Sequence, residues 1–284
     1  MIRGHEVALA TLTVLDAAAP DLVDVAAVAG FDSVTLRLTD ASVADVNPLV
    51  GDTWTRRETI SRLRHHGLGV LDIEVVRMRE DTEPSLLRPV LESARELGAR
   101  HVLMINQVAD EARAADKLAC ISEEAQAFGL RTVLEFMVFT ATKTVEQADR
   151  IVELASHPAA GVLVDPLHLS RSRGTPANVA SLVAANPDRY PYAQLCDGPR
   201  AVPNGGGRTL YEEAVCNRLA PGDGGLPLVE LIEALPARAP LSVETPVGAV
   251  AHLVPRVRAE LAMAATRRLL ELAHDKDDPN GAAP

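Results

Sequence analysis

Aromatic residues are scarce in this chain of 284 residues, at 3% of the composition. Cysteine is rarer still, and the three cysteines, Cys120, Cys196 and Cys216, show neither metal-ligand nor redox spacing. A sparse, odd number of cysteines is typical of a reducing compartment, so we expect a cytoplasmic protein without disulfides. Because aromatics are few, Ala, Leu and Val must build most of the core within an apolar share of 47%.

The sequence also lacks an excess of positive charge and long apolar runs. The formal net charge is −11, which disfavours a nucleic acid partner, because binding a phosphate backbone requires a basic surface. No run of eighteen apolar residues occurs, and the first residues, MIRGHEVALA, do not follow the pattern of a signal peptide. We therefore expect neither a membrane span nor a membrane partner.

Glycine-rich phosphate loops are absent, since neither GxGxxG nor GxxxxGK[ST] occurs. Short apolar, β-branched runs instead alternate with amphipathic helical patterns, several of which end in Gly. We expect strands over residues 6–14, 32–40, 69–78, 100–108, 131–139, 161–169, 190–198 and 240–248.

Strict alternation of strand and helix predicts parallel strands, and eight such units have the size of a (β/α)₈ barrel. A doubly wound open sheet is the alternative, but it would favour a Gly-rich loop after an early strand. The sequence thus predicts an α/β fold consisting of a single (β/α)₈ TIM barrel over residues 1–274. We expect the remaining residues, 275–284, to form a disordered tail.

Polar residues stand late in four consecutive expected strands. They are Glu135 in VLEFM, Asp165 in VLVDPLHLS, Gln194 in YAQLCDG and Glu244 in LSVETP. In a barrel such residues meet at one end, where three carboxylates would repel one another unless a cation lay between them. Oxygen-only ligation suits hard ions, so we expect one divalent cation, Mn²⁺ or Mg²⁺, with Co²⁺ or Zn²⁺ as further options. Gln194 would be a neutral ligand.

Other polar positions leave two interpretations open. Each of the four residues, taken singly, could be a solvated loop residue or an ion-pair partner. Glu74 and Arg77, in DIEVVR, could bind substrate or form a plain salt bridge. Asp197 is expected to cap a turn, and Cys196 to be a small buried apolar residue. The long segment 199–226 is expected to be a lid over the barrel mouth or a surface insertion.

The order of VLEF, VDPLH, QLCDGP, RLAPGDGGLPL and SVETP resembles the xylose-isomerase-like TIM barrels over about residues 5–272. That family includes sugar isomerases, ketose 3-epimerases, inosose-processing enzymes and 3-dehydroshikimate dehydratases. The resemblance implies that one divalent metal is bound by Glu135, Asp165, Gln194 and Glu244. It also implies that His168 contacts the substrate and that Arg218 binds a substrate oxygen or carboxylate. We further expect that one or both of Glu135 and Glu244 act as acid or base, and that His168 donates a hydrogen bond to the substrate or acts as a second acid or base.

Gln194 bears on the choice of reaction. Most isomerases and epimerases of the family have histidine there, whereas the dehydratases resemble this chain, with Q-L-x-D-x-P followed by an R-x-x-P-G-x-G-like turn. The dehydratases, however, have a richer Ser/Arg/His set where this chain has EEAVCNRLAPG. We expect a metal-dependent isomerase or epimerase that removes a proton next to a carbonyl of a small polyhydroxylated substrate. A dehydratase is the alternative.

Two further classes of protein could use this barrel. A binding barrel without catalysis is the second alternative, because an amide is a weaker ligand than imidazole. A metal-dependent DNA-repair endonuclease of this barrel type is disfavoured, because it would need several metals, many strand-end histidines and a basic groove. Association into a homo-oligomer is left open.

Overall fold

The computed structural model describes residues 1–38 and 47–277, with side chains as far as residue 273. Eight parallel strands form one sheet in the order β6-β5-β4-β3-β2-β1-β8-β7. They are β1 (Val7–Leu9), β2 (Ser33–Arg37), β3 (Gly69–Met78), β4 (Ala99–Asn106), β5 (Arg131–Glu135), β6 (Ala160–Leu163), β7 (Ala193–Leu195) and β8 (Leu241–Val243). A parallel bridge between Val164 and Ala193 joins the two edges, and the Gln194 N–H donates to the Val164 carbonyl at 2.9 Å. The barrel is therefore closed, as predicted.

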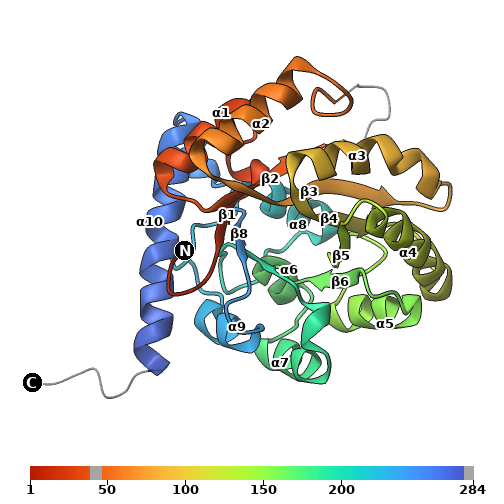
Figure 1. The fold of residues 1–284 in the computed structure, drawn as a ribbon. Coiled ribbons are helices and arrows are strands. Elements are labelled where there is room, and N and C mark those ends of the chain that lie inside the picture. Colours follow the sequence, from red (N-terminus) through yellow and green to blue (C-terminus); the bar gives the residue numbers. More distant parts are fainter. Residues whose placement is uncertain (39–46, 278–284) are drawn as a thin grey trace, which may run out of the picture.

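Eight helices surround the strands, one after each strand (Figure 1). They are α1 (Ala19–Ala29), α2 (Trp54–His66), α3 (Arg88–Leu97), α4 (Glu111–Gln126), α5 (Val145–Ala155), α7 (Pro176–Ala185), α9 (Leu228–Ala234) and α10 (Pro255–Asp277). Two more helices, α6 (Pro166–Arg171) and α8 (Gly206–Cys216), follow β6 and β7 directly. Short 3₁₀ helices cover Thr11–Val14, Pro84–Leu87, Pro187–Arg189 and Gly248–Val250. The two extra helices thus belong to the end of the barrel where its strands terminate.

Several expected element bounds are wrong. The strand expected over 161–169 ends at Leu163, and His168 lies in α6, because the Asp165 side chain caps that helix and Pro166 opens it. The segment 199–226 is not one long loop, since it contains α8. α10 runs to Asp277, three residues into the expected tail. Residues 39–40 of the expected second strand and residues 278–284 of the tail lie outside the described residues.

The buried apolar side chains form two layers. The inner layer fills the barrel and includes Leu71, Leu103, Val133 and Tyr192. The outer layer, which is much larger, lies between strands and helices and consists mainly of Leu, Val, Ile and Ala. Because successive strand residues face opposite sides, the same strands supply both layers. Within the described residues, no helix is both long and apolar enough to span a membrane.

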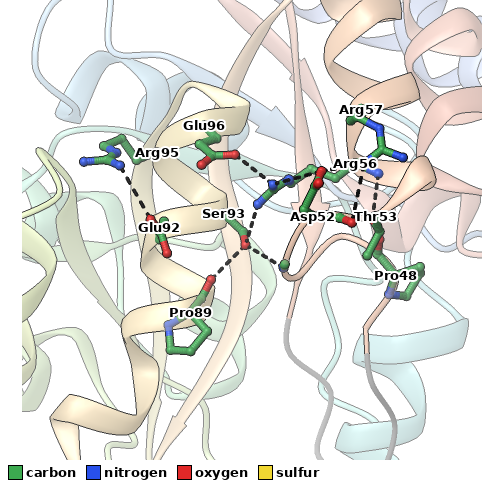
Figure 2. A network of polar contacts seen from close by, with 11 residues as sticks. Pro48, Asp52, Thr53, Arg56, Arg57, Pro89, Glu92, Ser93, Arg95 and Glu96 are labelled. Carbon is green, nitrogen blue, oxygen red and sulfur yellow. Dashed lines mark hydrogen bonds and ion pairs between the residues drawn. The ribbon is translucent and has the colours of Figure 1, made fainter.

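A polar network fastens the segment before α2 to α3 (Figure 2). The buried Arg56 pairs with Glu96 at 2.9 Å and donates to Ser93 Oγ at 3.2 Å. Ser93 Oγ also accepts the Gly51 N–H, and Thr53 caps α2 by accepting the Arg56 N–H at 3.0 Å. This network fixes the start of α2 and the residues before it to α3.

His101 lies near the start of β4, toward the amino end of the barrel. Its ring is buried beside Tyr192, with the ring centres 4.8 Å apart, and its Nδ1 donates to the Leu71 carbonyl at 3.0 Å. Burial lowers the pKa of His101 from 6.5 to about 4. The folded protein therefore holds this imidazole neutral at pH values where the unfolded chain would protonate it.

We predict that His101 makes the protein less stable in acid. Between pH 6.5 and pH 4 the unfolded chain binds a proton at this site that the folded protein does not, so the free energy of unfolding falls by up to about 1.4 kcal/mol per pH unit. Urea unfolding of the wild type and of His101→Phe at several pH values measures this. The variant should lose less stability than the wild type on acidification, and parallel pH profiles would contradict the assignment.

Candidate active site at the carboxyl end of the barrel

A cavity of about 540 Å³ lies at the carboxyl ends of the strands. Its charged and polar lining residues include Arg37, Glu74, Arg77, Glu135, His168, Arg218 and Glu244. Its apolar lining residues include Leu103, Ile105, Met137, Phe139 and Val215. A largely apolar pocket with a few convergent polar groups is the usual form of a small-molecule site.

Two buried carboxyl groups, Glu135 and Glu244, line this cavity, and a third, Asp165, lies behind the lining residue Arg218. Glu135 is the last residue of β5, Glu244 follows β8, and Asp165 follows β6. Burial raises the pKa of Glu135 well above its usual value, and the charges of Glu244 and Asp165 raise it further. Burial also raises the pKa of Glu244 to about 7, although Arg218 opposes this effect. Joint ionisation of the three carboxyl groups therefore requires a compensating positive charge.

Arg218 provides positive charge within this cluster. The side chain is only 2% exposed. Its guanidinium donates a hydrogen bond through Nη1 to Asp165 Oδ2 and forms an ion pair through Nη2 with Glu244 Oε2 at 2.8 Å. Its Nε donates to the Ala214 carbonyl in α8 at 2.7 Å. Burial disfavours an ionised Asp165, but Arg218 and neighbouring donors outweigh it and hold the pKa of that carboxyl below its usual value.

Gln194 is 3% exposed and belongs to the same end of the barrel. Its side-chain oxygen is buried and has no hydrogen-bond partner among the described residues. An unpaired buried amide oxygen costs free energy, so this atom has an unused capacity to accept a hydrogen bond or to coordinate a cation.

The donor chemistry fits a hard divalent cation. The four predicted ligands offer oxygen atoms only, Gln194 Oε1 is unpaired, and the carboxylates lack full charge compensation. In the arrangement shown, however, no group of three or more His, Cys, Asp or Glu among the described residues is placed to hold a metal ion. Arg218 contacts two of the four predicted ligands instead. The metal site therefore stays a prediction.

His168 reaches the cavity from α6 and not from a strand. Its Nε2 lies 3.7 Å from Glu135 Oε1, and its ring contacts Phe139 edge to face, with the ring centres 5.7 Å apart. Burial lowers the pKa of His168 to about 4, so the imidazole is neutral at physiological pH. A neutral ring in this position can either donate or accept a hydrogen bond.

Glu74 and Arg77 both line the cavity, although three residues separate them on one strand. In a regular strand they would face opposite sides, but the register of β3 shifts between Ile73 and Val76. Burial raises the pKa of Glu74 to about 7. The charge partner of Glu74 is Arg37, at the end of β2 and 3.7 Å away, so the plain salt bridge with Arg77 is not the pairing found.

The sequence pattern defining the xylose isomerase-like TIM barrels matches residues 23–271 of this chain. The chain belongs to this family. Among curated proteins, a 3-dehydroshikimate dehydratase of Pseudomonas putida is 25% identical over 241 residues. That match covers 79% of the chain, and the chain spans about a third (35%) of the length of this relative.

Solved structures of similar fold include three informative cases. A xylose isomerase-like TIM barrel/4-hydroxyphenylpyruvate dioxygenase fusion protein superposes with a TM-score of 0.78 and 22% identity, covering 99% of this chain and 45% of the fusion. The IolI protein with a bound zinc atom superposes with a TM-score of 0.76 and 18% identity, covering 94% of this chain and 99% of IolI. An L-ribulose 3-epimerase superposes with a TM-score of 0.66 and 17% identity, covering 99% of this chain and 100% of the epimerase. At these identities the likeness shows the fold alone.

In this family member α8 forms part of the cavity wall, through Tyr211, Ala214, Val215 and Cys216. A buried ion pair joins α8 to α6: Arg171 Nε donates to Glu213 Oε2 at 2.7 Å, and its Nη2 donates to Glu213 Oε1 at 2.6 Å. Arg171 Nη2 also donates to the Pro199 carbonyl at 2.9 Å. The helix that carries Ala214, the acceptor for Arg218, is thus fixed to the helix that carries His168.

Asp197 organises the turn that follows α8. Its two carboxylate oxygens accept the backbone N–H groups of Gly198, Gly222, Gly224 and Leu226 at 2.7–3.1 Å. The prediction that Asp197 caps a turn is confirmed. A Cβ at Gly224 would lie 2.4 Å from Asp197 Oδ1, so only glycine fits there without a shift. Cys196 is buried as expected, but its Sγ also accepts from Arg218 Nη1 at 3.2 Å.

Arg37, Phe139 and Tyr211 line the cavity but were not among the predicted site residues. Arg37 ends the strand segment VTLR, so the rule that found Glu135 would also have found it. Phe139 and Tyr211 had no such signal, because they are placed by the chain beyond β5 and by α8. Phe139 contacts both Tyr211 and His168, which links the two helices across the cavity wall.

We predict that Glu213→Ala destabilises the protein by about 3–5 kcal/mol, because it leaves the Arg171 guanidinium buried without its charge partner. Glu212 is the matched control, since it stands next to Glu213 but makes an exposed pair with Arg208 at 3.2 Å. Glu212→Ala should change the free energy of unfolding by less than about 1 kcal/mol. Urea unfolding measures both, and equal effects would refute a structural role for the buried pair.

Proposed function

We propose that this chain is a metal-dependent dehydratase. It would remove a proton from the carbon next to a carbonyl of a small polyhydroxylated substrate and then eliminate a β-hydroxyl group. The observation that carries the proposal is the pair Glu135 and Glu244, two buried carboxyl groups in the wall of one cavity. A carboxyl group within reach of a substrate can act as general base, and a second one can act as general acid.

The two carboxyl groups can divide the proton transfers. In the ionised state, one takes the proton from the substrate carbon as the C–H bond breaks. The electron pair of that bond forms the carbon–carbon double bond as the bond to the β-hydroxyl breaks. In the protonated state, the other carboxyl group gives its proton to the departing hydroxyl, which leaves as water.

Arg218 and His168 are placed to bind substrate oxygens. Arg218 is a fixed positive charge in the cavity wall, where it would stabilise negative charge that develops on the substrate. His168 is neutral and can donate a hydrogen bond to a hydroxyl or carbonyl oxygen. The apolar wall around Met137, Phe139 and Val215, together with α8, would exclude water from the reacting carbon.

The four predicted ligands, Glu135, Asp165, Gln194 and Glu244, would hold the cation. A bound divalent cation supplies polarisation of the substrate carbonyl, which acidifies the neighbouring C–H bond. The zinc in the structurally similar IolI protein supports a metal in this fold, and the unpaired oxygen of Gln194 supports it in this chain.

Elimination is favoured by the 25% identical dehydratase and by Gln194, which sets this chain apart from the histidine-bearing isomerases it resembles. Epimerisation is the second candidate, because the same two carboxyl groups could remove a proton from one face and return it to the other. The fold likeness to an L-ribulose 3-epimerase is in keeping with that outcome. Both reactions begin with proton abstraction, and they differ in whether a hydroxyl then leaves or the proton returns.

The test is mass spectrometry of ketoses, inososes and 3-dehydroshikimate after incubation with the protein in D₂O, with Mn²⁺ or Mg²⁺. We expect loss of water from one compound and no reaction after the metal is chelated. Gain of one deuteron without loss of water would replace the dehydratase by an epimerase or isomerase. Turnover that persists in full after chelation would refute the metal dependence.

We predict that Glu135→Gln and Glu244→Gln each lower kcat by about 10³-fold or more, because glutamine has the shape of the acid or base without its proton. The measurement is the rate of product formation on the compound that reacts. Circular dichroism should show an unchanged fold, and exposed Glu212→Gln is the control with normal turnover. Full activity in either active-site variant would refute its role.

A further inference from the structure

The buried charges around the cavity do not balance. Four carboxyl groups, Glu74, Glu135, Asp165 and Glu244, are each at most 5% exposed. Arg218 is buried and contacts two of them, Asp165 and Glu244. Arg37 is half-buried and lies 3.7 Å from Glu74. The cluster therefore has a strong demand for positive charge, and Arg218 meets part of that demand.

Arg218 compensates negative charge at carboxylate oxygens that would also be ligands of a metal cation. Its Nη1 binds Asp165 Oδ2, and its Nη2 binds Glu244 Oε2 at 2.8 Å. These are two of the four carboxylate or amide groups predicted to hold a metal. The other two, Glu135 and Gln194, include the unpaired oxygen Gln194 Oε1. The guanidinium thus occupies half of the predicted ligand set and leaves the other half available.

The Nε end of the Arg218 guanidinium is held in place by a backbone hydrogen bond. Its Nε donates to the Ala214 carbonyl at 2.7 Å, and α8 is itself fixed to α6 by the buried pair of Arg171 and Glu213. Nη1 contacts Asp165 and Cys196 and Nη2 contacts Glu244, so the Nε bond does not depend on the partners of the two Nη groups. Because Arg218 already lines the cavity, a small movement would turn these two groups from the carboxylates to a molecule in the cavity.

We propose that Arg218 is a built-in counter-cation that competes with the divalent metal for Asp165 and Glu244. Without metal, it holds these carboxylates in place and keeps the metal affinity low. With metal, its Nη groups leave the carboxylates and become free for a substrate oxygen. This inference rests on the proposed function in that a divalent cation binds here. Metal and substrate would then strengthen each other's binding, because linkage is reciprocal.

The first test is titration of the metal-free protein with Mn²⁺ in the absence of substrate. The concentration of free Mn²⁺ is measured by electron paramagnetic resonance. Arg218→Met should bind Mn²⁺ about tenfold more tightly than the wild type, a coupling of ordinary size. Arg37→Met is the matched control, because it removes the same charge from the same cavity but from a residue paired with Glu74. It should change the affinity much less.

The outcomes separate this inference from the proposed function. Wild-type binding with equal or weaker binding by Arg218→Met would overturn the competition and leave the metal-dependent function standing. Equal tightening by Arg37→Met would replace the competition with a general charge effect, which also overturns it. Absence of Mn²⁺ binding in all three proteins would overturn both. Binding by Arg218→Met alone would support the competition in its extreme form.

A second measurement covers the case in which Arg218→Met does not fold. The wild type is labelled with ¹⁵N-arginine, and the Arg218 Nε–H signal is identified as the one missing in Arg218→Lys. Saturating Mg²⁺ should shift this signal, because the Nη groups change partners around it. A signal that stays unchanged while Mg²⁺ binds would overturn the proposal.

Discussion

The site depends on one constraint: several carboxyl groups are buried together, and a positive charge must lie among them. Arg218 satisfies part of this constraint and connects three parts of the barrel in doing so. It binds Asp165 after β6, Glu244 after β8 and the Ala214 carbonyl in α8. Removal of the guanidinium would leave two carboxylates buried without this charge partner, at a cost of several kcal/mol. The local structure and the local electrostatics are therefore not separable.

The same constraint explains why α6 and α8 interrupt the simple alternation of strand and helix. α6 begins where Asp165 caps it, so one carboxylate oxygen is used by the helix and the other remains for a cation. α8 brings the Ala214 carbonyl to Arg218 Nε and apolar side chains to the cavity. The Arg171–Glu213 pair joins the two helices. The additional helices thus place the chemistry, while the eight outer helices enclose the barrel.

The fold and most of the site could be predicted from the sequence because both depend on local patterns. Alternating strand and helix patterns predicted the closed barrel, and polar residues after apolar runs predicted Glu135, Asp165 and Glu244 at its carboxyl end. The errors have physical causes that a single sequence does not reveal. Because Asp165 caps a helix, His168 lies in α6 and not in the expected strand. Because the register of β3 shifts, Glu74 and Arg77 both face the cavity. The pairing of Arg218 with two predicted metal ligands depends on where α8 places it.

Burial acts in opposite directions on His101 and on the carboxyl groups of the cavity. At the amino end, burial lowers the pKa of His101, and the neutral ring packs against Tyr192 and donates to a backbone carbonyl, which contributes to stability above pH 6.5. At the carboxyl end, burial raises the pKa of Glu74 and Glu244 to about 7, so each can gain or lose a proton near neutral pH. A neutral imidazole such as that of His101 or His168 acts through hydrogen bonds and packing, whereas a group poised between two charge states can also move protons. Because parallel strands run from the first end to the second, the barrel separates the residues that hold it together from those that can carry out chemistry.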